Sequence, residues 1–199
     1  KPFIEYLISS VVNYEPQSIH FCLGIRSEMY VEHFEKLKKT FKITYSIEDE
    51  NNLLGTGGAI KNAISFLEQD FVVQYGDTIL DIDYNDLYSK HVQSGMKMTM
   101  SILPKFLSNE KPNIKCEKKE SGYLSCIYDK LNPPEDSNYI DYGAIVFNKS
   151  IFESEEKNKF DLSVIQNKLT LNNQTYFYEA DKPYIEIGNP TSYKNAFNS

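Results

Sequence analysis

Apolar residues recur along this chain at two spacings, one typical of amphipathic helices and one typical of strands. A spacing of three to four residues predicts helices at 3–13, 27–37, 59–67, 85–94, 161–171 and 190–197. Short continuous or alternating apolar runs predict strands at 19–23, 43–47, 71–75, 98–102 and 139–147. Strands therefore alternate with helices through the first half of the chain.

This alternation predicts an α/β fold with a doubly wound, mostly parallel, Rossmann-like sheet, because parallel neighbours need crossover connections. The pattern changes after about residue 104. Residues 113–128 predict an antiparallel hairpin turning at Ser121-Gly122, which we interpret as an insertion or lid on the same sheet. The whole of 1–199 is expected to form a single domain.

Composition and charge narrow the range of functions. The chain has 199 residues, of which 25% are charged, and a formal net charge of −7. This acidic balance favours neither nucleic acid nor a membrane surface as a partner. No apolar run spans a membrane and no signal peptide is visible, so a cytoplasmic location is expected. The three cysteines form no CxxC pair, and their odd number disfavours a disulfide framework.

A glycine-rich segment at residues 53–58 follows one predicted strand and opens a predicted helix. In open α/β sheets ligands bind outside the carboxyl ends of the strands, where a helix N-terminus offers N–H donors. Gly55, Gly57 and Gly58 would let the backbone approach a flat ligand closely. The alternative is a tight strand-to-helix turn without a ligand, and the segment matches neither GxGxxG nor a Walker A motif.

Three charged residues stand where chemistry could occur. Asp77 directly follows the strand 71–75, where a carboxylate faces the ligand crevice and is a natural Mg²⁺ ligand, although an Asx-turn or cap is the alternative. Glu186 lies between apolar residues at the end of a short strand, a position that solvent-facing edge residues also occupy. Lys130, taken alone, is best interpreted as an ordinary surface lysine.

Short motifs occur in a definite order along the chain. They are Lys1-Pro2-Phe3-Ile4-Glu5-Tyr6, Leu54-Gly55-Thr56-Gly57-Gly58-Ala59, Tyr75-Gly76-Asp77-Thr78, Tyr128-Asp129-Lys130, Ile140-Asp141-Tyr142-Gly143 and Glu186-Ile187-Gly188. Together they resemble the sugar-phosphate nucleotidyltransferase family over nearly the whole chain. The resemblance is greatest to short members similar to heptose-1-phosphate and mannose-1-phosphate guanylyltransferases.

The resemblance implies three groups of site residues. The nucleotide-binding group consists of Gly55, Thr56, Gly57, Gly58 and Gly76. Asp77 would bind a catalytic Mg²⁺, and Glu186, where many members carry Asp, would be the second metal carboxylate. Lys130 would meet the phosphate of the sugar phosphate. Asp141 and Gly143 would line the sugar pocket.

The implied substrates are an NTP, namely GTP, CTP or UTP, and a sugar 1-phosphate, with Mg²⁺ as cofactor. GTP is favoured by proximity to the guanylyltransferases, while the sugar and the oligomeric state are left open. The family's Gly-Gly-x-Gly-Thr-Arg loop, which cradles the triphosphate, is not in this sequence. Residues 1–199 are therefore expected to lack the domain's N-terminal strand and phosphate loop, and to have little transfer activity by themselves.

Two other functions remain open. One is a non-catalytic relative, such as a sugar-nucleotide sensor, that kept the pocket and lost the phosphate loop. The other is a nucleotide-sugar glycosyltransferase, in which Asp81-Ile82-Asp83 would be a metal-binding DxD motif. Lys130 and residues 139–143 give that reading no support, and Asp81 and Asp83 are better interpreted as helix-capping or solvated carboxylates.

Overall fold

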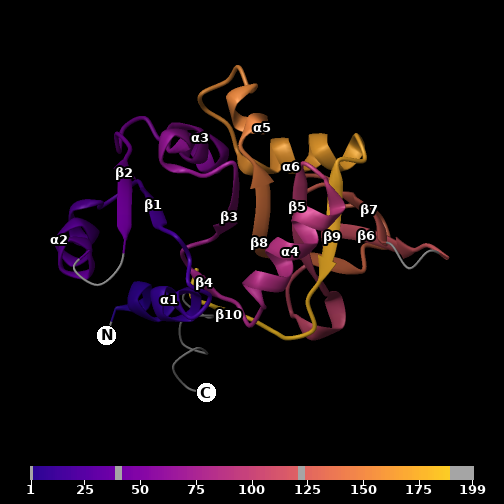
Figure 1. Cartoon of the computed structure of the whole chain (residues 1–199). Helices are drawn as coiled ribbons and strands as arrows, with labels where there is room; N and C mark the ends of the chain where they lie inside the picture. The colour runs from indigo at the N-terminus through magenta and orange to yellow at the C-terminus, as the bar shows by residue number, and fades with distance from the viewer. Residues whose placement is uncertain (1, 39–41, 121–123, 189–199) are drawn as a thin grey trace. The chain divides into compact units, whose positions relative to one another are not determined.

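The computed structural model describes residues 2–38, 42–120 and 124–188 (Figure 1). Its helices are α1 (Phe3–Val12), α2 (Glu28–Leu37), α3 (Gly55–Asn62), α4 (Tyr84–Ser94), α5 (Ser150–Glu153) and α6 (Leu162–Leu171), with 3₁₀ turns η1 (Ile64–Phe66) and η2 (Lys105–Leu107). None of these described helices combines the length and the apolar character needed to cross a membrane.

The strands are short except for two that form the centre of the larger sheet. They are β1 (Ile19–Leu23), β2 (Ile43–Ile47), β3 (Asp70–Gln74), β4 (Thr78–Ile79), β5 (Met98–Pro104), β6 (Ile114–Lys118), β7 (Leu124–Tyr128), β8 (Tyr139–Asn148), β9 (Thr175–Glu179) and β10 (Ile185–Glu186). The predicted helices and strands inside the described ranges are confirmed to within a few residues, except the helix predicted at 59–67, where α3 ends at Asn62 and the 3₁₀ turn η1 follows. The predicted helix at 190–197 and the turn at Ser121-Gly122 lie outside the described residues.

The α/β class is confirmed, and the larger sheet is mixed. Strands β1 and β2 pair in parallel, as do β5 and β9. The six-stranded sheet runs β7-β6-β8-β5-β9, with β3 also on β8, and its β5–β8, β6–β8 and β6–β7 pairings are antiparallel. Parallel pairing therefore occurs between β1 and β2, two strands that the sequence predicted, and between β5 and β9, of which only β5 was predicted. Antiparallel pairing enters with the predicted hairpin and with β8.

The chain divides into two compact units, whereas the single domain expected from sequence stays a prediction. The first unit comprises residues 1–14, 72–147 and 166–199, and the second comprises residues 15–71 and 148–165. The second unit buries Phe34, which is stacked on Phe21 with 4.3 Å between ring centroids, together with Phe152 and Leu162. Each unit thus has its own apolar core, as expected for a chain of this length.

Strands β5 and β8 form the buried centre of the first unit. Every residue of β5 and most residues of β8 are buried, because their apolar runs are covered on both faces. Ser101 is fully buried there, and its hydroxyl donates to the Ala144 carbonyl at 2.6 Å and accepts from the Ala144 N–H at 3.1 Å. The buried polar side chain is therefore satisfied, which is the condition for placing it in a core.

The β6–β7 hairpin corrects one sequence expectation. Cys116 and Cys126 lie opposite each other in its register and form a disulfide, with Cα atoms 4.1 Å apart. The odd cysteine count disfavoured a disulfide framework, and it could not reveal that two of the three cysteines face each other across a hairpin. The remaining cysteine, Cys22, is free.

Candidate active site

Asp77 and Glu186 are brought together by the shortest strand pair in the first unit. Asp77 immediately precedes β4, and Glu186 ends β10. These strands are antiparallel with Thr78 opposite Glu186, and the Ile187 N–H donates to the Asp77 carbonyl at 2.9 Å. The pairing therefore sets two carboxylates beside each other although they are far apart in the sequence.

Gly188 is the point on which both carboxylates converge. A Cβ on this residue would lie 2.7 Å from Asp77 Oδ2 and 2.8 Å from Glu186 Oε1, closer than real Cβ atoms approach other atoms. Both oxygens are thus within 2.8 Å of one position, so they are no farther apart than twice that distance. The Thr78 hydroxyl donates to Asp77 Oδ1 at 3.0 Å, which orients the carboxylate and leaves Oδ2 facing Glu186.

The electrostatics of this pair favour a cation between them. Burial, and then the negative charges of Glu110 and Asp77, raise the pKa of Glu186 above its ordinary value. Within the described ranges, no three His, Cys, Asp or Glu side chains are grouped to hold a metal. A cation shared by Asp77 and Glu186 would thus take its remaining ligands from water or substrate.

The predicted sugar-side residues also lie together. The Gly143 N–H donates to Asp141 Oδ1 at 3.0 Å, in a backbone conformation with φ of +98° that favours glycine. Burial raises the pKa of Asp141, and the hydrogen bond from Gln166, the Gly143 N–H and the charge of Lys130 each oppose that rise. Lys130 is therefore close enough to Asp141 to stabilise its negative charge.

The loop that carries Lys130 is shaped by its neighbour. Asp129 Oδ1 accepts from the N–H groups of Leu131 and Asn132, each at 2.9 Å, which is an Asx-turn. The side chain of Lys130 itself is exposed. The turn thus fixes the backbone around Lys130.

Tyr184 lies within electrostatic range of carboxylates from both groups, and it was not predicted as a site residue. Its ring packs edge-on against Tyr142 with centroids 5.7 Å apart. Burial raises the pKa of Tyr184, a hydrogen bond with Ser108 opposes that rise, and the negative charges of Glu110, Glu186 and Asp141 add to it. Both carboxylate groups therefore act on one phenol. The only signal in the sequence was the position of Tyr184, two residues before Glu186.

The glycine-rich segment belongs to the second unit and differs from its predicted form. Helix α3 begins at Gly55, so the glycines lie inside its first turns. The N–H groups of Gly57 and Gly58 donate to the Phe160 carbonyl at 3.0 and 3.1 Å, and Thr56 Oγ1 accepts from the Leu162 N–H at 2.9 Å. The segment thus anchors residues 158–162, and base binding by these residues stays a prediction.

Comparison with known proteins decides the family. The whole chain, residues 1–199, matches the family described as nucleotidyl transferase. The chain belongs to the nucleotidyl transferase family. The fold is shared with HddC from Yersinia pseudotuberculosis complexed with GMP-PN, at a TM-score of 0.75 and 22% identity, covering 100% of this chain and 85% of that one.

Two curated relatives carry the same description, D-glycero-alpha-D-manno-heptose 1-phosphate guanylyltransferase. The protein of Aneurinibacillus thermoaerophilus is 29% identical over 208 residues, covering 98% of this chain and 84% of the relative. That of Campylobacter jejuni is 26% identical over 196 residues, covering 97% and 83%. The family resemblance inferred from the motifs is therefore confirmed.

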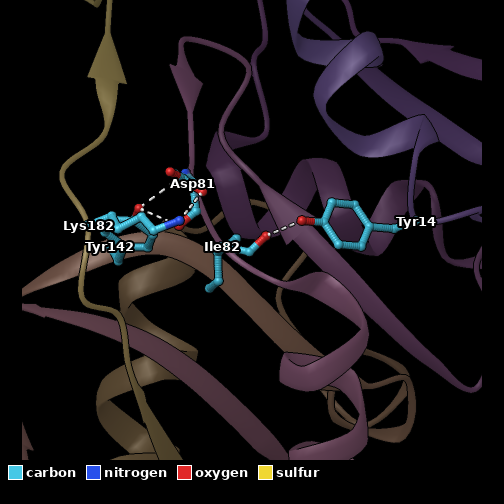
Figure 2. Close-up of polar contacts among 5 residues, drawn as sticks. All are labelled: Tyr14, Asp81, Ile82, Tyr142 and Lys182. Atoms are coloured by element: carbon cyan, nitrogen blue, oxygen red, sulfur yellow. Dashed lines mark hydrogen bonds and ion pairs between the residues drawn. The ribbon is translucent and has the colours of Figure 1, made fainter.

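The Asp81-Ile82-Asp83 segment of this nucleotidyl transferase has a structural role. Asp83 is the N-cap of α4, accepting from the N–H groups of Asn85 and Asp86 at 2.9 and 3.1 Å. Figure 2 shows Asp81 paired with Lys182, with 3.0 Å between Oδ1 and Nζ. Both carboxylates already have partners, which weighs against the DxD reading.

The backbone around this segment is held by two tyrosines. The Asp81 N–H donates to the Tyr142 hydroxyl at 3.2 Å, and the Tyr14 hydroxyl donates to the Ile82 carbonyl at 3.0 Å (Figure 2). Tyr142 is also part of the apolar core of the first unit. These bonds fix the chain between β4 and α4 and so support the strand that Asp77 immediately precedes.

Gly76 offers a test that separates ligand binding from packing in this nucleotidyl transferase. A Cβ at Gly76 would meet nothing within 4 Å, so the fold does not require glycine there. Gly76→Ala is expected to leave the free energy of unfolding within about 0.5 kcal/mol of wild type. Turnover should fall by about tenfold, because the methyl group would displace a nucleotide bound beside Asp77. Unchanged turnover would remove Gly76 from the predicted nucleotide-binding group.

Proposed function

We propose that this protein transfers a nucleotidyl group from an NTP to a sugar 1-phosphate, giving a nucleotide-sugar and pyrophosphate. The observation that carries the proposal is the convergence of Asp77 and Glu186 at Gly188. Lys130 and Asp141 lie in the same compact unit as Asp77 and Glu186. The charged groups proposed to bind the NTP and the sugar 1-phosphate therefore belong to one unit. Family membership over the whole chain supports this reading over a non-catalytic relative or a glycosyltransferase.

Mg²⁺ is the proposed cofactor, held by Asp77 and Glu186. Two converging carboxylates give hard oxygen ligands, and Mg²⁺ commonly takes one or two of these and completes its shell with water and substrate phosphates. When bound, the ion would neutralise charge that develops on the phosphate oxygens.

The chain's own residues have simple tasks in this reaction. Lys130 attracts and orients the phosphate of the sugar 1-phosphate, whose oxygen attacks the α-phosphorus of the NTP as pyrophosphate leaves. Asp141 accepts hydrogen bonds from sugar hydroxyls. The nucleophile is already ionised, so no protein base and no covalent intermediate are required. The acceleration of the reaction comes from positioning the two substrates and from stabilising the negative charge on the transferred phosphate.

GTP and a heptose 1-phosphate are the proposed substrates. Two curated relatives are described as heptose 1-phosphate guanylyltransferases, and the HddC structure is described as complexed with GMP-PN. CTP and UTP are the alternatives. We place the reaction in the cytoplasm, and we expect residues 1–199 alone to have little activity because they contain no Gly-Gly-x-Gly-Thr-Arg cradle.

A substrate panel tests the proposal. The intact protein is incubated with each of the four NTPs and with hexose or heptose 1-phosphates, with and without Mg²⁺, and pyrophosphate is measured. Release is expected only when NTP, sugar 1-phosphate and Mg²⁺ are all present, and it should be fastest with GTP and a heptose 1-phosphate. Folded, intact protein that binds these ligands and turns over no pair would instead support a sensor.

A further inference from the structure

A series of hydrogen bonds between buried side chains leads to Asp141. Gln166, on α6, is fully buried, and Tyr128, at the end of β7, is 1% exposed. The Tyr128 hydroxyl donates to Gln166 Oε1 at 3.3 Å, and Gln166 Nε2 donates to Asp141 Oδ2 at 2.9 Å. Burying a polar group costs free energy unless the group is hydrogen-bonded. These paired side chains are therefore an integral part of the first unit.

The functional groups of Tyr128, Gln166 and Asp141 determine which atom donates and which accepts in each of these hydrogen bonds. The amide oxygen of Gln166 can only accept, so the Tyr128 hydroxyl must be its donor. The amide nitrogen then faces Asp141 and donates to a carboxylate, which makes that bond charge-assisted and stronger than a neutral one. The Asp141 carboxylate can only accept, so it selects the amide orientation that presents an N–H group to it, and the Tyr128 hydroxyl holds the amide oxygen at the other end.

Both oxygens of the Asp141 carboxylate therefore accept a hydrogen bond from the protein, which fixes the orientation of the carboxylate. Gln166 donates to Oδ2, the Gly143 N–H donates to Oδ1 at 3.0 Å, and the Asp141 N–H donates to Asn113 Oδ1 at 3.1 Å. Each carboxylate oxygen keeps a lone pair for another donor. Asp141 as a whole residue keeps part of its surface exposed.

We propose that Gln166, which is also hydrogen-bonded by Tyr128, is a positioning residue that sets affinity for the sugar by holding the Asp141 carboxylate in one rotamer. This inference rests on the proposed function, because it takes Asp141 to bind the sugar of a sugar 1-phosphate. Gln166 itself has no exposed surface and touches no substrate. Neither Gln166 nor Tyr128 was identified as a site residue from the sequence.

Steady-state kinetics of the intact protein test the inference. Gln166→Met keeps the approximate side-chain length and removes both hydrogen bonds. It is expected to raise the KM for the sugar 1-phosphate by about ten- to a hundredfold, the scale of one hydrogen bond to a charged group. The KM for the NTP should change by less than about twofold, because the hydrogen bonds of Gln166 run to Tyr128 and Asp141. Tyr128→Phe should raise the sugar KM by about threefold, since it removes only the longer, neutral bond.

Two controls distinguish positioning from general destabilisation. Thr170→Val removes a different buried hydroxyl from the same helix, one whose partner Thr175 is 3.4 Å away, and should leave the sugar KM unchanged. In an Asp141→Asn background, Gln166→Met should add less than about twofold, because the two residues act through one contact.

The outcomes are separable. A wild type that turns over no substrate pair overturns the proposed function and this inference with it. An active wild type overturns the inference alone if Gln166→Met raises both KM values equally or leaves the sugar KM unchanged. Should Gln166→Met fail to fold, Tyr128→Phe decides: a selective rise in the sugar KM supports the inference, and an unchanged sugar KM overturns it.

Discussion

Replacing Asp77 by Asn in the intact protein is expected to lower turnover by roughly 10²–10³, the scale for loss of one preorganised electrostatic group. The substitution keeps the size of the side chain and removes its charge. Asp77 Oδ2 is one of two carboxylate oxygens within 2.8 Å of the position of a Cβ on Gly188. A cation at this point would lose half of the protein charge that holds it. Steady-state turnover over a range of Mg²⁺ concentrations measures the effect.

Glu186→Gln is expected to act on the same ion. It should lower turnover by a similar factor, again roughly 10²–10³. The double variant with Asp77→Asn should be much less impaired than the product of the two single effects, because residues that serve one ion are not additive. A fully multiplicative double variant would mean that Asp77 and Glu186 act at separate sites.

Asp83→Asn is the matched control for charge removal. Asp83 caps α4, and Asn is as good an N-cap as Asp, so the helix should be retained. Turnover is expected to stay close to that of wild type. If Asp83→Asn abolished activity while Glu186→Gln had no effect, the metal would lie on the Asp81-Ile82-Asp83 segment and the glycosyltransferase reading would gain.

Gly58→Ala should destabilise the second unit, although alanine normally favours a helix. Within an open helix this change stabilises by about 0.8–1 kcal/mol. Here the new Cβ would lie 2.4 Å from the Asn158 carbonyl oxygen and 2.8 Å from Leu54 Cβ, and the first of these is backbone that cannot rotate away. Overpacking of this kind costs about 1–3 kcal/mol. We expect a net loss of about 2 kcal/mol, measured by denaturant unfolding.

Gly76→Ala is the control for Gly58→Ala, because its Cβ would meet nothing within 4 Å. Its unfolding midpoint should equal that of wild type while the midpoint of Gly58→Ala falls. A Gly58→Ala protein as stable as wild type would show that residues 158–162 do not pack on α3 as the structure has them.

Local patterns predicted the elements well where one physical rule dominated. The continuous apolar run of β8 and the alternation of apolar residues with other residues in β2 each predict a strand, and each is a strand in the structure. Strand β9 was missed although Thr175-Tyr176-Phe177-Tyr178 is rich in strand-forming side chains, because no periodic apolar face marks it. Strand β4 has two residues and is too short for any periodic signal.

The candidate site was predicted in part for a related reason. Asp77 and Glu186 could be inferred because each stands at a strand end beside a recognisable motif. Gln166 could not, since a glutamine within a helix gives no sign that it is buried or that it faces Asp141. The fold also assigns Gly57 and Gly58 a packing role on Phe160, a contact between segments far apart in the sequence that local glycine content does not reveal.

Transfer of a labelled α-phosphate tests the central claim most directly. The intact protein is incubated with GTP labelled at the α-phosphorus, a heptose 1-phosphate and Mg²⁺, and the products are separated. The label is expected to appear in a nucleotide-sugar, and unlabelled pyrophosphate should be released in equal amount. Label that stays in GDP or GMP with no nucleotide-sugar formed, or label that stays in GTP at every substrate combination, would contradict it.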